Sequence, residues 1–308
     1  MTVTAGNADA VILLYHGVTD SLSEGIENFS HKHQPAEVFR KQMAFISSHC
    51  SPMPLREMAE RLADGCSLPL RPVSVTFDDT FLNNATVAKP ILEETGVPAT
   101  FFVATGFIGT NRRFWVDRLE HAINATRLTE IQSPVDGCRV PLTNAKERIA
   151  AVVAIKAEMK RMEPAQRDTI LRILEETAQA EEKDVANYRN MSWDDVRSLD
   201  RPPFFEVGGH TVNHEILSYL SDEDLFSETA HCINDLADHL ERRSGLFAYP
   251  EGQATHFDDR VIACLKKQGV KICPSAIDGI NRPGVDPFHL RRIMVGFMGR
   301  SFPWTMGD

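Results

Sequence analysis

The sequence has no Cys-x-x-Cys pair and no cluster of cysteines. Its six cysteines are widely separated, at Cys50, Cys66, Cys138, Cys232, Cys264 and Cys273. Such spacing does not suit a disulfide framework of the kind that stabilises small secreted domains. It indicates reduced, mostly buried thiols and predicts a cytoplasmic location.

Long hydrophobic runs are missing as well. The first ten residues contain no Lys or Arg, and the apolar run that follows, residues 10–15, is interrupted by His16 and Gly17. A run this short is neither a signal peptide nor a membrane span. We therefore expect no membrane span, which agrees with the predicted cytoplasmic location.

Positive charge is in deficit. There are 33 Lys and Arg against 43 Asp and Glu, and the formal net charge is −10. Because nucleic-acid affinity depends largely on basic residues that neutralise phosphates, we expect no nucleic-acid partner. A hydrophobic content of 43% with 25% charged residues excludes a disordered or fibrous chain.

Apolar runs alternate with amphipathic segments along most of the chain. The expected strands are residues 10–15, 73–77, 99–103, 204–207, 246–249 and 270–273. The expected helices are residues 36–46, 55–63, 85–95, 192–199, 222–242 and 258–268, with Ser192 as an N-cap. Continuous apolar strands between helices are typical of a parallel α/β sheet or barrel.

The alternation stops between about residues 110 and 190. This stretch is charged and helix-prone, notably at residues 145–162 and 164–180, and it shows no obvious strand. We interpret it as a helical insertion. The length of 308 residues suits one α/β catalytic domain, residues 1–308, that carries this insertion.

Chemically active side chains follow three of the expected strands. They are His16, the pair Asp78 and Asp79, and the two histidines of the segment His210–His214. In a parallel α/β fold the carboxyl ends of strands form the usual site of chemistry. Two histidines and one carboxylate make an open site for zinc or a similar divalent metal. The neighbouring aspartate is then available as a base.

Each of these signals has a plainer explanation when it is taken alone. Asp78 and Asp79 could cap the following helix, and His210 and His214 could be two solvated histidines. A non-haem iron oxygenase also uses two histidines and a carboxylate, but the sequence shows no site for its co-substrate. The order and placement of all the groups together favour the metal hydrolase.

The sequence resembles the polysaccharide deacetylases, the NodB-homology group or carbohydrate esterase family four. Thr76–Asp79 is similar to the first family motif, His210–His214 to the second and Phe247–Pro250 to the third. The resemblance implies a distorted parallel (β/α) barrel. It implies that Asp78 is the general base and that Asp79, His210 and His214 bind one divalent metal. We expect zinc, with cobalt, nickel and manganese as alternatives.

The same resemblance implies further roles. Tyr15-His16 is similar to a motif of one branch, in which the histidine is a candidate general acid. Arg292 is similar to an arginine that orients the catalytic aspartate. The third motif implies that Tyr249, Pro250 and Glu251 line the substrate groove and that a backbone amide near Glu251 serves the oxyanion hole.

Three positions depart from the family pattern. Thr80 stands where a glycine is common, Glu251 where a tyrosine is usual, and Phe247 where many relatives carry an arginine. The first two leave open whether catalysis is weakened. The third makes Arg292 more important for Asp78.

The expected activity is hydrolytic removal of an N-acyl group, in first place N-acetyl, from an amino sugar or glycan intermediate. The partner is a carbohydrate, free or linked to a nucleotide or lipid. Two alternatives remain: hydrolysis of another non-peptide C–N bond on the same fold, and a catalytically weak sugar-binding protein. The sequence does not indicate the oligomeric state.

Overall fold

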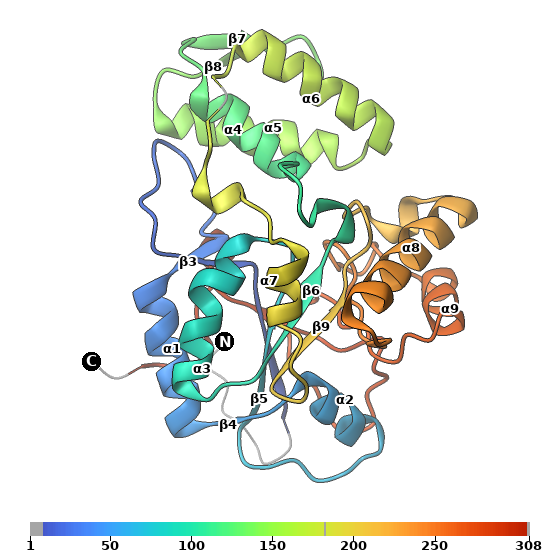
Figure 1. The fold of residues 1–308 in the computed structure, drawn as a ribbon. Helices are drawn as coiled ribbons and strands as arrows, with labels where there is room; N and C mark the ends of the chain where they lie inside the picture. The colour runs from blue at the N-terminus through green and yellow to red at the C-terminus, as the bar shows by residue number, and fades with distance from the viewer. Residues whose placement is uncertain (1–8, 182, 307–308) are drawn as a thin grey trace. The chain divides into compact units, whose positions relative to one another are not determined.

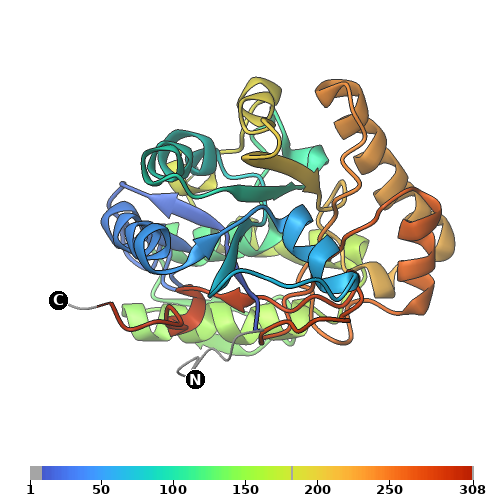
Figure 2. The same ribbon diagram turned by 90° about the horizontal axis from the view of Figure 1, so that it is seen from below.

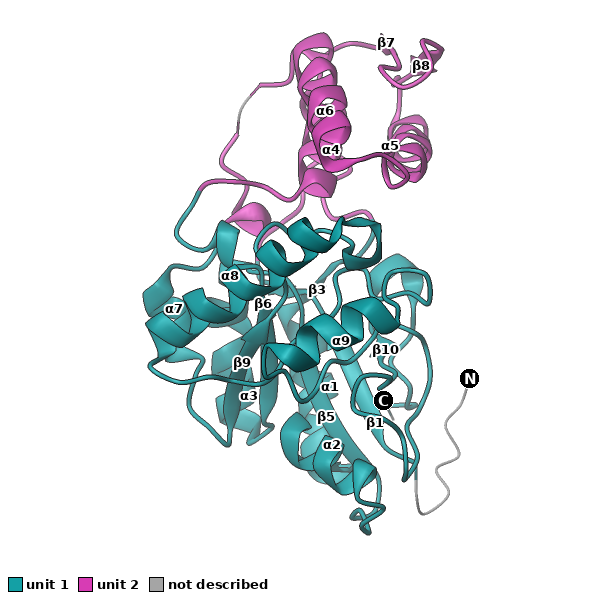
Figure 3. Ribbon diagram, turned by 90° about the vertical axis from the view of Figure 1, so that its right-hand side faces the viewer, with its two compact units in different colours: residues 1–20, 30–110, 190–308 teal, residues 21–29, 111–189 magenta. Residues whose placement is uncertain are grey.

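The computed structural model describes residues 9–181 and 183–306 and divides the chain into two compact units. The first comprises residues 1–20, 30–110 and 190–308, and the second comprises residues 21–29 and 111–189 (Figure 3). The second unit closely matches the predicted insertion, and it also takes in a short segment after the first strand. That the two units form one catalytic domain stays a prediction.

A parallel sheet is the centre of the first unit (Figure 1). Its strand order is β10-β1-β5-β6-β9, with β4 beside β5, and each of these pairs is parallel. The strands are β1 (Val11–Tyr15), β4 (Ser51–Pro52), β5 (Pro72–Phe77), β6 (Ala99–Val103), β9 (Phe205–Gly209) and β10 (Ile293–Met294). The predicted parallel α/β architecture is therefore confirmed. A small second sheet pairs β2 (Gly17–Thr19) with β3 (His33–Pro35).

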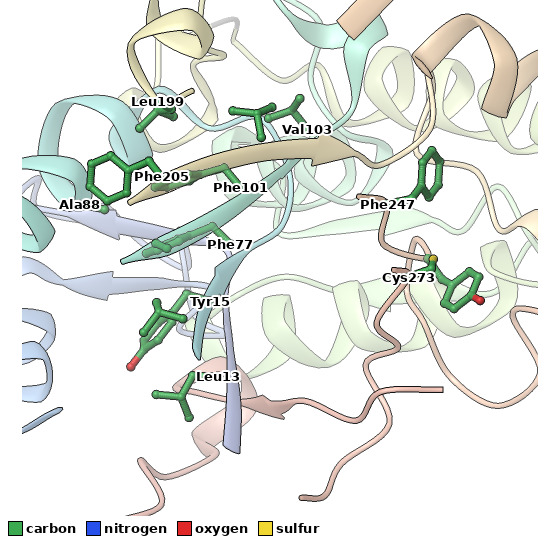
Figure 4. Close-up of a cluster of buried hydrophobic side chains, with 14 of the residues drawn as sticks. Leu13, Tyr15, Phe77, Ala88, Phe101, Val103, Leu199, Phe205, Phe247 and Cys273 are labelled. Atoms are coloured by element: carbon green, nitrogen blue, oxygen red, sulfur yellow. The ribbon is translucent and has the colours of Figure 1, made fainter. Parts of the chain in front are cut away.

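The central strands are buried on both faces, which explains their unbroken apolar sequences. Leu13 and Phe101 belong to a core that includes side chains from the flanking helices (Figure 4). Their neighbours Ile12 and Phe102 belong to a different cluster, which includes Met58 of α2 (Leu55–Ala63). Successive side chains thus alternate between two apolar clusters, one on each face of the sheet.

Helices lie outside the arc of strands in the view from below (Figure 2). They are α1 (Ala36–His49), α3 (Lys89–Thr95), α7 (Trp193–Ser198), α8 (Asp222–Leu240) and α9 (Asp259–Lys267). The predicted cap of α7 is confirmed, because the Ser192 side chain accepts from the Asp195 backbone amide in a capping box.

Two predicted strands and one predicted helix differ from the structure. Residues 246–249 and 270–273 form only isolated parallel bridges, Gly209 with Phe247 and Leu246 with Ile272. Prolines follow both segments and supply no N–H to continue a ladder. The predicted helix 85–95 begins as a π-helix, Asn84–Ala88, and becomes α-helical only from Lys89.

The second unit has its own apolar cluster, formed mainly by α4 (Trp115–Ala125), α5 (Ala145–Met159) and α6 (Pro164–Ala178). The two predicted helices are present, but the expectation of no strand is wrong. An antiparallel hairpin joins β7 (Glu130–Gln132) to β8 (Arg139–Pro141). Its strands are too short to give a periodic signal, although Asp136-Gly137 between them is a turn signal.

All six cysteines are unpaired in the structure. Cys232 and Cys273 are buried, whereas Cys66 and Cys138 are exposed, so the thiols are less uniformly buried than the sequence suggested. Among residues 9–181 and 183–306, no helix combines the length and the apolar character that a membrane crossing requires.

Candidate active site

Three predicted metal ligands come together where β5 and β9 end. Asp79 lies two residues beyond β5, and His210 and His214 lie in the segment that follows β9. Their ligand atoms all lie within 4.8 Å of one another. The Oδ1 atom of Asp79 is 3.3 Å from Nε2 of His214 and 3.9 Å from Nε2 of His210. These residues form a candidate divalent metal site.

One of these two separations fits a tetrahedral metal, and the other is wider. Ligands about 2.0–2.1 Å from a tetrahedral zinc ion lie about 3.3–3.4 Å apart, close to the shorter of the two separations. The Nδ1 atom of His210 is 2.9 Å from the Ala248 carbonyl oxygen, to which it can donate. That bond leaves Nε2 as the atom with a free lone pair. Burial lowers the pKa of His210, which favours the neutral imidazole that a metal requires.

The backbone at the site has an unusual conformation. Asp79, Thr211, His214 and Glu251 have φ values of 71°, 65°, 59° and 58°, in the left-handed region that side-chain-bearing residues rarely adopt. Such conformations persist where surrounding contacts fix them, and they concentrate at functional sites. They could not be expected from the sequence, because none of the four residues is glycine.

Asp78 forms a buried ion pair with Arg292. The guanidinium donates from Nη1 to Oδ1 at 2.7 Å and from Nη2 to Oδ2 at 2.8 Å, and the arginine has no exposed surface. It also donates to the Ser275 carbonyl oxygen and to the Thr76 hydroxyl. Burial by itself would raise the pKa of Asp78, but Arg292 and His210 outweigh it and lower this pKa. The carboxylate is therefore ionised at neutral pH, as a base must be.

The structure accounts for two departures from the family pattern. The Thr80 side chain is fully buried, and its hydroxyl lies 3.1 Å from both the carbonyl oxygen and the amide nitrogen of Ala104. Thr80 thus ties the end of β5 to the end of β6. Phe247 is fully buried, and its ring lies against Gly209. A charged arginine side chain would not suit that apolar position.

His16 lies beside this group at the end of β1. Its ring centroid is 5.7 Å from that of Phe297, and its carbonyl oxygen accepts from the Asn84 side chain at 2.9 Å. Burial lowers the pKa of His16 to about 3, and the Asp78 carboxylate offsets this effect only in part. The imidazole is therefore neutral at neutral pH. As a general acid it would have to gain its proton during the reaction.

The third motif borders the site through its backbone. Ala248 accepts from His210, which places the next residues beside the metal ligands. The Tyr249 ring, by contrast, is fully buried, stacks on Phe257 at 4.1 Å and donates from its hydroxyl to the Phe288 carbonyl oxygen. Its side chain therefore belongs to the core. Pro250 is also buried and Glu251 is half-buried.

Sequence reasoning missed residues that organise the histidines. His33 is 1% exposed and lies in β3, a strand that is not among those expected from the sequence. Its Nδ1 atom is 2.9 Å from Nδ2 of Asn83, while the next residue, Asn84, holds His16. The adjacent residues Asn83 and Asn84, which begin four residues after Asp79, were the available sequence signal.

Comparison with known proteins agrees with this geometry. The family model for polysaccharide deacetylase matches residues 67–273, more than half of the chain. No curated protein matches the sequence. Solved structures with a similar fold include IcaB from Ammonifex degensii, with a TM-score of 0.60 and 19% identity, covering 94% of this chain and 92% of that one.

Two further structures are similar over most of their length. The deacetylase PplD from Streptococcus pyogenes, in complex with acetate, has a TM-score of 0.61 and 16% identity, covering 96% of each chain. A de-N-acetylase from Aggregatibacter actinomycetemcomitans has a TM-score of 0.55 and 15% identity, covering 92% of this chain and 94% of that one. At these identities the likeness concerns the fold, a distorted β/α barrel. The match of the family model establishes the family: the chain belongs to the polysaccharide deacetylases.

Proposed function

We propose that this protein is a metal-dependent hydrolase that removes an N-acetyl group from an amino sugar. One observation carries the proposal: the three-ligand cluster of Asp79, His210 and His214 lies beside an ionised aspartate that is held by a buried arginine. A pure binding site has no use for a second carboxylate fixed next to a metal ligand. The family implies the carbohydrate substrate.

The two aspartates divide the work. A divalent ion held by Asp79 and the two histidines would polarise the acyl carbonyl and strengthen water as a nucleophile. Asp78 accepts a proton from the attacking water. Arg292 holds both carboxylate oxygens of Asp78, so the base keeps its orientation while the bond forms.

The surrounding residues handle the charge and the proton that follow. Attack by water produces a tetrahedral oxyanion, which accepts a hydrogen bond from a backbone amide near Glu251. The left-handed backbone of Glu251 turns the chain beside the site. Losing one such donor typically costs about a hundredfold to a thousandfold in rate. His16 begins neutral, receives the proton that Asp78 has taken from the attacking water and passes it to the leaving nitrogen, so both side chains return to their starting states. Amine and carboxylate are the products.

Acetyl is the proposed acyl group because acetate is the molecule bound in the Streptococcus pyogenes deacetylase, whose fold is similar to that of this chain. Zinc is the proposed metal because it accepts a mixed set of imidazole and carboxylate ligands. The sugar is an intermediate, free or linked to a nucleotide or lipid. A cytoplasmic location stays a prediction.

The proposal is tested with N-acetylated monosaccharides, sugar nucleotides and short oligosaccharides. Release of acetate and amine should require zinc and should be lost in His214→Ala. His231→Ala, which removes an exposed histidine of α8, is the matched control and should keep full activity. Release that is unchanged in His214→Ala, or that continues in the metal-free protein, would contradict the proposal.

A further inference from the structure

The metal ligands His210 and His214 lie in a segment without regular secondary structure. Residues 210–214 follow β9 and precede the short helix Leu217–Tyr219. Thr211 and His214 have left-handed backbones, and this segment therefore depends on outside contacts to keep its conformation. The contacts that fix this backbone thus determine where the two imidazoles lie.

One side of the segment is held through its carbonyl groups. The Thr105 amide donates to the Thr211 carbonyl oxygen at 3.0 Å, and the Gly106 amide donates to the Val212 carbonyl oxygen at 2.9 Å. Both donors lie in the turn just after β6. These bonds leave the N–H groups of the segment to be satisfied by other acceptors.

A single carboxylate on α8 accepts from the other side. Oε2 of Glu228 accepts from the Val212 amide at 3.0 Å and from the Asn213 amide at 2.8 Å, and Oε1 accepts from the Asn213 side chain at 2.6 Å. Glu228 lies between Leu225 and Cys232, which pack into the core. The packed face of α8 therefore positions the carboxylate.

We propose that Glu228 is the positioning residue of the metal site and that it sets metal affinity by fixing the backbone between His210 and His214. Neither this residue nor its helix belongs to the three motifs that first indicated the site. Glu228 acts on the metal only through the segment, because its side chain accepts hydrogen bonds from Val212 and Asn213. The inference rests on the proposed metal-dependent function.

Glu228→Gln provides the first test. The new amide can still accept from the two backbone N–H groups, but its NH₂ group then faces the NH₂ group of Asn213. Loss of an outer-shell partner typically lowers metal affinity about 10- to 100-fold, and we expect a fall of that size for zinc. Asp238→Asn makes the same chemical change at an exposed position of α8 and should leave the affinity unchanged.

The single change Asn213→Asp separates positioning from simple charge, because the double variant restores both the hydrogen bonds and the net charge. In the double variant Glu228→Gln/Asn213→Asp the donor and acceptor exchange places, so the hydrogen bonds are restored and zinc affinity should recover. Asn213→Asp alone places two carboxylates together, and positioning predicts weaker zinc binding. If Glu228 acted only through its negative charge, Asn213→Asp alone would instead strengthen zinc binding.

The experiment is a zinc titration of the metal-free full-length chain by calorimetry, with thermal unfolding of each metal-free variant measured in parallel. Positioning predicts weak binding in Glu228→Gln and in Asn213→Asp among molecules that remain folded, and recovery in the double variant. Stronger zinc binding in Asn213→Asp than in the wild type would contradict it. Equal zinc affinity in Glu228→Gln, Asp238→Asn and the wild type would overturn the inference. Failure of the wild type itself to bind zinc would instead contradict the proposed function.

Discussion

Arg292→Ala should lower the melting temperature and the rate of acetate release much more than the same change at its neighbour Arg291. Arg292 is fully buried and donates four hydrogen bonds, to Asp78 twice, to Ser275 and to Thr76. Removing one partner of a buried ion pair costs about 3–5 kcal/mol, because the other charge is left without compensation. With roughly 2–4 °C of melting temperature per kcal/mol, the expected fall is about 6–20 °C.

Arg291 supplies the control. It is exposed, and its guanidinium donates to the Asp278 carbonyl oxygen. Surface substitutions of this kind usually change stability by about 0.5 kcal/mol or less. Thermal unfolding and acetate release of both variants provide the assay. Equal effects of Arg291→Ala and Arg292→Ala on melting temperature and rate would refute the assigned ion pair.

The same substitution should change the pH dependence of stability. In the wild type the folded-state pKa of Asp78 is lowered below its unfolded value of about 3.9. The contribution of Asp78 to stability is therefore fully present above the unfolded pKa and is lost as pH falls through the folded-state pKa. Without Arg292, burial should raise that pKa, and stability should then fall as pH rises through it. The difference in melting temperature between Arg292→Ala and the wild type should shrink as pH falls from about 7 to about 4. A difference that stays constant with pH would contradict this linkage.

Three further outcomes are expected. His214→Ala removes a ligand, so zinc affinity measured by calorimetry should fall by more than the roughly 100-fold upper range for an outer-shell change. Thr80→Gly removes the buried hydroxyl that bonds Ala104 and should lower the free energy of unfolding, measured by chemical denaturation, by about 1–3 kcal/mol. It should not raise kcat, and a faster enzyme would mean that Thr80 weakens catalysis. Gly209→Ala brings a methyl group to 2.7 Å from the Phe247 ring, and overpacking of this kind lowers stability by about 1–3 kcal/mol. Unchanged stability and zinc affinity would show that the backbone next to the metal ligands can shift at little cost.

The sequence was most informative where apolar runs end in polar groups. The strand that ends at Phe77 is buried along its whole length, so its apolar run and its last residue could be predicted. Asp78 and Asp79 follow it directly. The convergence of Asp79, His210 and His214 could be predicted because parallel strands bring their carboxyl ends to one edge. Arg292 was predicted from family resemblance and not from its spacing, since it lies 214 residues from Asp78.

What escaped prediction depends on single contacts that leave no periodic pattern. Glu228 lies on an ordinary amphipathic helix, and the bonds it makes to Val212 and Asn213 become evident only in three dimensions. The left-handed backbone of Asp79 occurs in a residue type that does not require it. Tyr249 was assigned to the substrate groove, but stacking on Phe257 gives its ring a place in the core that local sequence could not indicate.

In the proposed mechanism the two adjacent aspartates have different tasks: Asp79 holds the metal and Asp78 accepts the proton. The most direct measurement is acetate release during stepwise addition of zinc to metal-free wild type, Asp78→Asn and Asp79→Asn, with bound zinc determined in each sample. We expect release in proportion to bound zinc in the wild type, saturating at one ion per chain. We also expect zinc binding without release in Asp78→Asn and loss of tight zinc binding in Asp79→Asn. Release by Asp78→Asn at the wild-type rate, or tight zinc binding by Asp79→Asn, would contradict the mechanism.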